Sequence, residues 1–241
     1  MYKEKVLITS NDVDNHYCLK VSSIFKLLQM VSTNHSEILH IGKEDVMNNG
    51  MIWVVTKMQV NIYEYPHLND EIMVCTHPGA TKKFIYPRFY EIYDKKGKLL
   101  IAGAAIWVLL DANSRRLITK PLENKKLVDE PHKDDIALPN SFSIPGECLK
   151  IEDRKVRYND IDLNGHLNNT KYVDYIVDIN DKKFYDSYQV KQIVISYEHE
   201  IKEGQIVTIY QLKMDNDQYV KGEIEGKTSF SAYLQFNERI N

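Results

Sequence analysis

The stretch Asn159-Asp-Ile-Asp-Leu-Asn-Gly-His-Leu-Asn-Asn169 gathers more reactive side chains than any other part of the 241-residue chain. It brings two carboxylates and a histidine together within a few residues. Apolar and aromatic residues then recur at helical spacing, at positions 172, 173, 176 and 179, which predicts a loop that leads into a helix. Backbone N–H groups at a helix N-terminus lack intrahelical acceptors and favour negative charge. The pattern therefore favours chemistry on a polarised carbonyl group.

The first half of the chain carries a related stretch, Asn11-Asp-Val-Asp-Asn-His16, which is two residues shorter when the two histidines are aligned. Each stretch is followed by a helical pattern, which in the first half runs from Val21 to Met30. Runs typical of strands follow each helix, at 60–63, 70–74, 83–93 and 98–110 in the first half and at 194–197, 204–214 and 219–225 in the second. This repeat predicts an α+β fold in which a helix and a mostly antiparallel sheet occur twice. One continuous domain with accidental similarity is the alternative.

Four of the seven prolines lie between the halves, at positions 121, 131, 139 and 145. Proline lacks a backbone donor and disfavours strand pairing, so this segment is predicted to be a connection across the surface. We expect an N-terminal domain at 1–120, a linker at 121–149 and a C-terminal domain at 150–241.

Composition narrows the class of protein. Hydrophobic residues make up 43% and charged residues 27%, which is ordinary for a globular chain. A net charge of -3 argues against general nucleic-acid binding. Three widely spaced cysteines favour a reducing compartment over a disulfide framework. The first residues lack a signal-peptide pattern and no apolar run reaches about 18 residues, so we expect a cytoplasmic protein without a membrane span.

Residues 156–175 resemble the signature of the acyl-acyl carrier protein (acyl-ACP) thioesterases, a D-x-N-x-H-x-N-N run that precedes a helix. Segments at 53–58, 107–117 and 197–200 fit the same family, so the chain looks like a bacterial relative of the plant fatty acyl-ACP thioesterases. The resemblance implies a double hotdog fold, with two tandem domains that each wrap an antiparallel sheet around a long helix. It also implies that the N-terminal domain holds the acyl tail and that the C-terminal domain carries the catalytic site.

The resemblance maps the family's catalytic set onto Asp162, Asn164, His166 and Glu200. We interpret Glu200 as the general base that activates a water molecule, with His166 and Asn164 positioning water or substrate. Asp162 would orient this network. The roles of Glu200 and His166 could be exchanged, and the sequence does not decide between the two assignments.

The oxyanion and the nucleophile are the other parts of the expected reaction. Backbone N–H groups from Gly165 to Asn168 are expected to stabilise the oxyanion, since a helix terminus leaves such donors free. Plant members of the family tend to carry a cysteine after the glutamate, where this chain has Ile201. Attack by water is therefore favoured over a cysteine nucleophile, and no metal or organic cofactor is implied.

Other interpretations of the acidic stretch remain open at this point. The run from Asp160 to Gly165 matches the opening of a calcium loop, but Lys171 stands where a bidentate glutamate belongs. A zinc site lacks a second His or Cys at ligand spacing. The acids could also simply cap the helix. Glu198 competes with Glu200 for the role of the base, because alternate residues share one face of a strand.

The first-half cluster of Asp12, Asp14 and His16 is interpreted as a degenerate relic, because no Tyr-x-x-Glu sequence follows it. The sequence as a whole predicts a hydrolase that releases free fatty acid from acyl-ACP. An acyl-CoA thioesterase, a non-catalytic acyl-binding hotdog module and a hotdog dehydratase are the alternatives.

Acyl carrier protein is the expected partner, and no nucleic acid or membrane is expected. Because the carrier is acidic, a basic face should speed docking. Its candidate residues are Lys82, Lys83, Arg88, Arg115, Arg116, Lys120, Lys125 and Lys126. The sequence does not fix the length or saturation of the acyl chain. A homodimer also stays open, since the duplication already pairs two hotdog domains within one chain.

Overall fold

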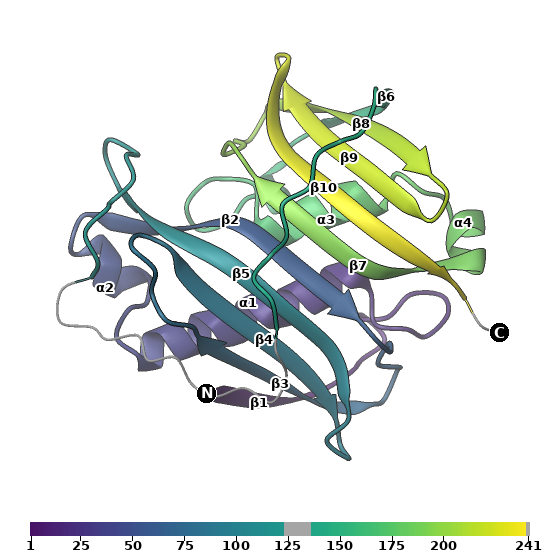
Figure 1. Ribbon diagram of the computed structural model, residues 1–241, viewed down its shortest axis with the longest axis horizontal. Coiled ribbons are helices and arrows are strands. Elements are labelled where there is room, and N and C mark those ends of the chain that lie inside the picture. Colours follow the sequence, from purple (N-terminus) through teal and green to yellow (C-terminus); the bar gives the residue numbers. More distant parts are fainter. Residues whose placement is uncertain (123–135, 240–241) are drawn as a thin grey trace. The chain divides into compact units, whose positions relative to one another are not determined.

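The computed structural model describes residues 1–122 and 136–239 (Figure 1). The chain divides into two compact units, Met1–Pro139 and Asn140–Asn241. Part of the expected linker, residues 123–135, lies outside the described residues. Among the described residues, no helix has both the length and the apolar character needed to cross a membrane.

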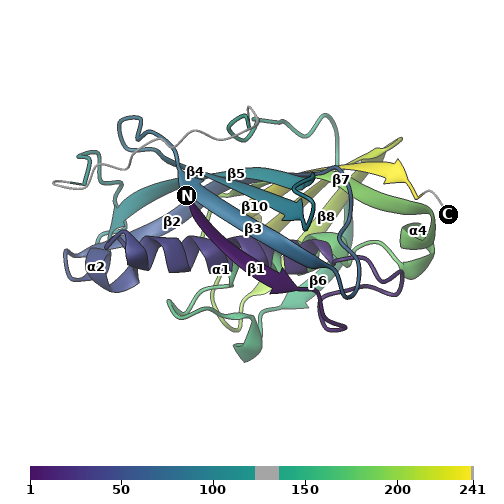
Figure 2. The same cartoon turned by 90° about the horizontal axis from the view of Figure 1, so that it is seen from below.

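The first unit is an antiparallel five-stranded sheet with a long helix along one face (Figures 1 and 2). The strands pair in the order β1-β3-β4-β5-β2. The elements are β1 (Tyr2–Leu7), α1 (Val21–Ile38), α2 (Lys43–Met47), β2 (Met51–Ile62), β3 (Glu71–Pro78), β4 (Tyr86–Asp94) and β5 (Leu99–Asp111).

The apolar stripe of α1 explains its position. Ile24, Leu28 and Val31 are fully buried, and burial of each such side chain contributes about 1.5–3 kcal/mol. Under the helix lies a buried polar group, Arg88, whose Nη1 is 3.2 Å from Nδ1 of His35. Burial and the Arg88 charge lower the pKa of His35 to about 4. Arg88 therefore belongs to the core, and its expected place on a basic docking face is wrong.

The second unit repeats the plan on a smaller scale. Its antiparallel strands pair in the order β7-β10-β9-β8-β6. The elements are β6 (Leu149–Lys155), the 3-10 helix η1 (Tyr158–Asp160), α3 (Asn169–Val177), α4 (Lys182–Ser187), β7 (Tyr188–Tyr197), β8 (Ile206–Met214), β9 (Asp217–Ile224) and β10 (Lys227–Glu238). Tyr172 of α3 packs edge-on against Tyr197 of β7 and Phe230 of β10, with ring centroids 5.1 and 5.2 Å apart.

The predicted order of a helix followed by a sheet, twice over, is confirmed in both units. Three strands were not predicted: β1 and β6, which precede the two loops, and β10. The helix of the second unit, α3, is also shorter than expected, with 9 residues against 18 in α1. Ile179 therefore lies beyond the end of α3.

Candidate active site

The loop before α3 is folded around Asp162. Oδ1 of Asp162 accepts hydrogen bonds from the backbone N–H groups of Asn164 at 2.8 Å and His166 at 3.2 Å. The Asp162 N–H donates to the carbonyl oxygen of His166 at 2.7 Å. Gly165 adopts a φ of 77°, a left-handed conformation that glycine reaches without strain. The carboxylate therefore fixes the backbone from which the His166 side chain projects.

His166 faces Glu200 directly. Nε2 of His166 is 3.3 Å from Oε2 of Glu200, and their side chains are 11% and 36% exposed. Backbone contacts between the two loops hold this pair. The Leu167 N–H donates to the Ile201 carbonyl at 2.7 Å, and His166 forms a β-bridge with Lys202. Two residues that are 34 positions apart in the sequence thus meet at a half-exposed site.

The segment that carries Glu200 lies beyond the end of β7 at Tyr197. Strand alternation therefore does not decide which glutamate faces His166. Glu198 accepts a hydrogen bond from Oγ of Ser231 at 2.9 Å, and Nδ1 of His199 lies 2.9 Å from the Thr228 carbonyl oxygen. Of the two glutamates, Glu200 is the one that pairs with His166.

The side chain of Asn164 is exposed, and its Nδ2 lies 3.4 Å from Oδ2 of Asp162. Asn164 is thus tied to the same carboxylate that holds the His166 backbone. The four residues expected at the site therefore form one connected group. Asp162 contacts Asn164 and His166, and His166 contacts Glu200.

The expected oxyanion donors are engaged elsewhere, so that prediction is wrong. The N–H groups of residues 165–168 donate in turn to the Asp162 carbonyl, Asp162 Oδ1, the Ile201 carbonyl and the Asp160 carbonyl. At the start of α3, Oδ1 of Asn168 accepts from the Thr170 N–H at 2.9 Å. Within the described part of the chain, no acceptor is found for the N–H of Asn169, the first residue of the helix.

Asp160 has a structural role. Its Oδ2 accepts from the Arg157 N–H at 2.9 Å and lies 3.3 Å from the hydroxyl of Tyr175. Nζ of Lys171 is 3.8 Å from Oδ1 of Asp160. No group of three or more metal-binding side chains gathers among the described residues. The cap of α3 is Asn168, so capping of this helix by the acids does not explain the loop.

Tyr172 lies next to the site and is a residue that the sequence analysis treated only as part of the helix face. It is buried, and burial raises the pKa of its hydroxyl, with further contributions from the negative charges of Glu200 and Asp162. No spacing rule in the sequence indicates this, because His166 lies on the loop whereas Tyr172 lies on α3, which begins at Asn169. The neutral phenol thus lies near both carboxylates.

The first unit contains the same turn without the same side chains. Oδ1 of Asp14 accepts from the N–H groups of His16 at 2.8 Å and Cys18 at 3.1 Å, and the Asp14 N–H donates to the Cys18 carbonyl at 2.9 Å. Asp12 binds the Thr9 N–H as Asp160 binds that of Arg157. The two stretches therefore align without a gap. The expected alignment of the two histidines is wrong, because Cys18 occupies the place of His166.

The partner loop of the first unit also follows its counterpart. The Leu19 N–H donates to the carbonyl of Pro66 at 2.8 Å, as that of Leu167 does to Ile201. Tyr65 therefore stands where Glu200 stands in the second unit. The Asp scaffold is repeated, but the His–Glu pair is found only in the second copy.

Comparison with known proteins agrees with this fold. The family model described as the acyl-ACP thioesterase N-terminal domain matches residues 1–124, and the C-terminal domain model matches residues 147–238. The oleoyl-acyl carrier protein thioesterase 2 of Arabidopsis thaliana is 26% identical over 225 residues, covering 86% of this chain and 61% of that protein. The palmitoyl-acyl carrier protein thioesterase of Cuphea hookeriana is 24% identical, covering 83% and 52%. The chain thus spans about three fifths or less of these two relatives.

Two solved structures share the fold. An acyl-ACP thioesterase from Bacteroides thetaiotaomicron superposes with a TM-score of 0.88 at 18% identity, covering 98% of this chain and 97% of that one. The 12:0-ACP thioesterase of Umbellularia californica gives a TM-score of 0.88 at 20% identity, covering 99% and 97%. These likenesses confirm the predicted α+β, double hotdog fold class.

Proposed function

The chain belongs to the acyl-ACP thioesterase family, and from that premise we propose that it hydrolyses an acyl-ACP thioester and releases the free fatty acid. The observation that carries the proposal is the contact of 3.3 Å between Nε2 of His166 and Oε2 of Glu200. His166 lies on the loop whose backbone Asp162 holds. A carboxylate beside an imidazole at a half-exposed site can bind a water molecule and remove its proton.

The reaction proceeds in two steps. Water attacks the thioester carbonyl carbon while Glu200 takes its proton, which gives a tetrahedral intermediate with a negative oxygen. The C–S bond then breaks, the carbonyl forms again to give the carboxylic acid, and the proton passes from Glu200 to the departing thiolate, which leaves as the thiol. His166, 3.3 Å from Oε2 of Glu200, positions the water. In the exchanged assignment, His166 takes the proton from the water and Glu200 orients the imidazole of His166.

Asp162 acts through the loop, because its two backbone hydrogen bonds place the His166 imidazole. Asn164 is proposed to position the water or the substrate with its exposed amide. The N–H of Asn169 is the proposed oxyanion donor, since a helix terminus leaves its first donor without an intrahelical acceptor.

The two parts of the chain have separate roles in this proposal. Residues 150–241 form the catalytic domain and contain all four proposed site residues. Residues 1–120 form the domain that holds the acyl tail, and residues 121–149 connect the two. The absence of a His–Glu pair from the first copy of the turn supports this division.

Acyl carrier protein is the proposed partner. Lys82, Lys83, Arg115, Arg116 and Lys120 are exposed and remain candidates for its docking face. Lys125 and Lys126 lie outside the described residues. We propose the cytoplasm as the compartment, because the three cysteines, all of which are described, form no disulfide.

A panel of acyl-ACP and acyl-CoA thioesters of increasing chain length tests the function. We expect faster turnover of the ACP thioesters, and a loss of about 10²-fold or more in the Glu200→Ala variant. Glu198→Ala is the matched control, because it removes a carboxylate two residues away that pairs with Ser231. Turnover by Glu200→Ala equal to that of Glu198→Ala would refute the proposed base, and equal rates with CoA thioesters would refute the proposed carrier.

A further inference from the structure

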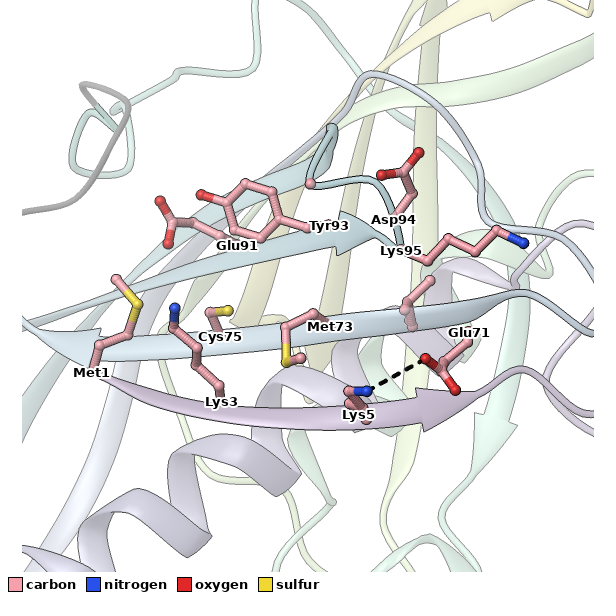
Figure 3. Close-up of a pocket in the computed structure, with 12 residues that line it drawn as sticks. Met1, Lys3, Lys5, Glu71, Met73, Cys75, Glu91, Tyr93, Asp94 and Lys95 are labelled. Carbon is pink, nitrogen blue, oxygen red and sulfur yellow. Dashed lines mark ion pairs between the residues drawn. The ribbon is translucent and has the colours of Figure 1, made fainter.

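A pocket of about 350 Å³ opens on the first unit, on the face of the sheet opposite α1 (Figure 3). Thr76 and Arg88 point toward α1, since Arg88 contacts His35 of that helix and also Thr76. Alternate residues of a strand point to opposite faces, so Cys75 and Glu91 point into the pocket.

The residues of the pocket form an ordered row. In the strand register, Lys3 of β1 is opposite Cys75 of β3, and Cys75 is opposite Glu91 of β4. Directly opposite side chains on neighbouring strands lie within contact range of one another. The row thus places a cationic and an anionic side chain on either side of a thiol.

Glu91 is the unusual member of this row. The residue is 1% exposed, and neither carboxylate oxygen has a hydrogen-bond partner within the described structure. A buried carboxylate without a donor is unfavourable unless a cation or another donor reaches it. Glu91 lines the pocket although its two oxygens are themselves covered, so a bound molecule can supply the missing donor once the side chain turns toward the opening.

Lys3 offers the complementary charge at the edge of the pocket. It is exposed and makes no ion pair with the described residues, whereas the neighbouring Lys5 pairs with Glu71 at 3.7 Å. Cys75 separates Lys3 from Glu91, and burial raises the pKa of its thiol to about 11, so the centre of the row is neutral. Met73 and Tyr93, one row further along, provide apolar surface.

We propose that this pocket binds a small zwitterion, an ω-amino carboxylate, whose ammonium group pairs with Glu91 and whose carboxylate pairs with Lys3. The short carbon chain lies over Cys75 and Met73. A cation alone would leave Lys3 unused, and an anion alone would leave Glu91 without a partner. The site is independent of the His166–Glu200 pair and does not depend on thioesterase activity.

Binding is measured by calorimetric titration of the full chain with glycine, 4-aminobutanoate and 6-aminohexanoate. Butylammonium and butanoate serve as half-ligands that match 4-aminobutanoate in length. We expect saturable binding of at least one zwitterion, and binding that is about tenfold or more weaker for each half-ligand. No saturation by any zwitterion up to about 50 mM overturns the proposal, as does equal affinity for butylammonium.

Two variants assign the charges. Glu91→Gln should weaken zwitterion binding by about tenfold or more, and Lys3→Met should weaken it without affecting butylammonium. Glu71→Gln is the matched control, because Glu71 also lines the pocket but already pairs with Lys5. If Glu91→Gln does not fold, the exposed Lys3→Met variant still decides the question. Stronger butylammonium binding by Lys3→Met would show that Lys3 itself neutralises Glu91, and the proposal would fail.

Discussion

Replacement of Asp162 separates the folding of the loop from its chemistry, because Asp14 makes the same turn in the first unit. The two carboxylates are both half-buried, and each accepts two backbone hydrogen bonds. The distances are 2.8 and 3.2 Å for Asp162, and 2.8 and 3.1 Å for Asp14. Asp162→Ala and Asp14→Ala therefore remove nearly the same interactions from two different places.

The expected loss of stability is the same for both variants. A hydrogen bond to a charged group contributes about 1.5–3 kcal/mol. Partial exposure reduces this, so we expect each variant to lose about 2–4 kcal/mol of its free energy of unfolding. Urea denaturation, followed by circular dichroism, measures both values.

The expected loss of turnover differs between the two variants. Asp162→Ala releases the His166 backbone, so the imidazole leaves its position 3.3 Å from Glu200. A displacement of about 1 Å at a reacting group costs roughly 10²-fold in rate. Asp14→Ala leaves that pair in place, and its single-turnover rate should stay within about threefold of the unmodified chain. Equal single-turnover losses in the two variants, measured where both are folded, would refute the positioning role of Asp162.

Three further outcomes are expected. Arg115→Glu together with Arg116→Glu should raise the KM for acyl-ACP at low salt, because both side chains are exposed and the carrier is acidic. An unchanged KM would show that the two arginines do not belong to the docking face. The pKa of His35 is lowered to about 4 in the folded chain, from an unfolded value near 6.5. The free energy of unfolding should therefore be highest above pH 6.5 and fall by about 1–3 kcal/mol as the pH drops toward 4, because the unfolded chain then binds the proton more readily. His35→Gln should flatten that part of a urea-midpoint profile, and an unchanged slope would assign it to other groups. Alanine at Cys18, Cys75 and Cys148 should leave turnover near normal, whereas a loss of about 10²-fold at any one would restore a cysteine nucleophile.

Local patterns predicted the helices α1 and α3 and most strands, because these elements have apolar residues at helical or strand periods. They did not predict the short helices α2, η1 and α4. The edge strands β1 and β6 were missed for a physical reason. Lysines 3 and 5 in β1 and the charged residues of β6 are typical of exposed edges, and single-sequence periodicity weakens there.

The site was predicted in part. The resemblance named His166 and Glu200, and the structure brings them together. The helix-terminus argument for the backbone oxyanion donors failed, because the N–H of Leu167 donates to the carbonyl of Ile201 on a loop that is remote in sequence. The alignment of His16 with His166 was wrong for a similar reason. The repeat is defined by which backbone groups Asp14 and Asp162 bind, and the identity of the neighbouring side chains does not reveal this.

The twin turns have a consequence for enzyme redesign. In the first copy the Asp14 carboxylate binds main-chain N–H groups of residues 16 and 18, so these hydrogen bonds do not depend on which side chains stand at the two positions. The first copy is therefore a ready host for grafting. Cys18→His combined with Tyr65→Glu would transplant the reactive pair onto a framework that already has the required backbone.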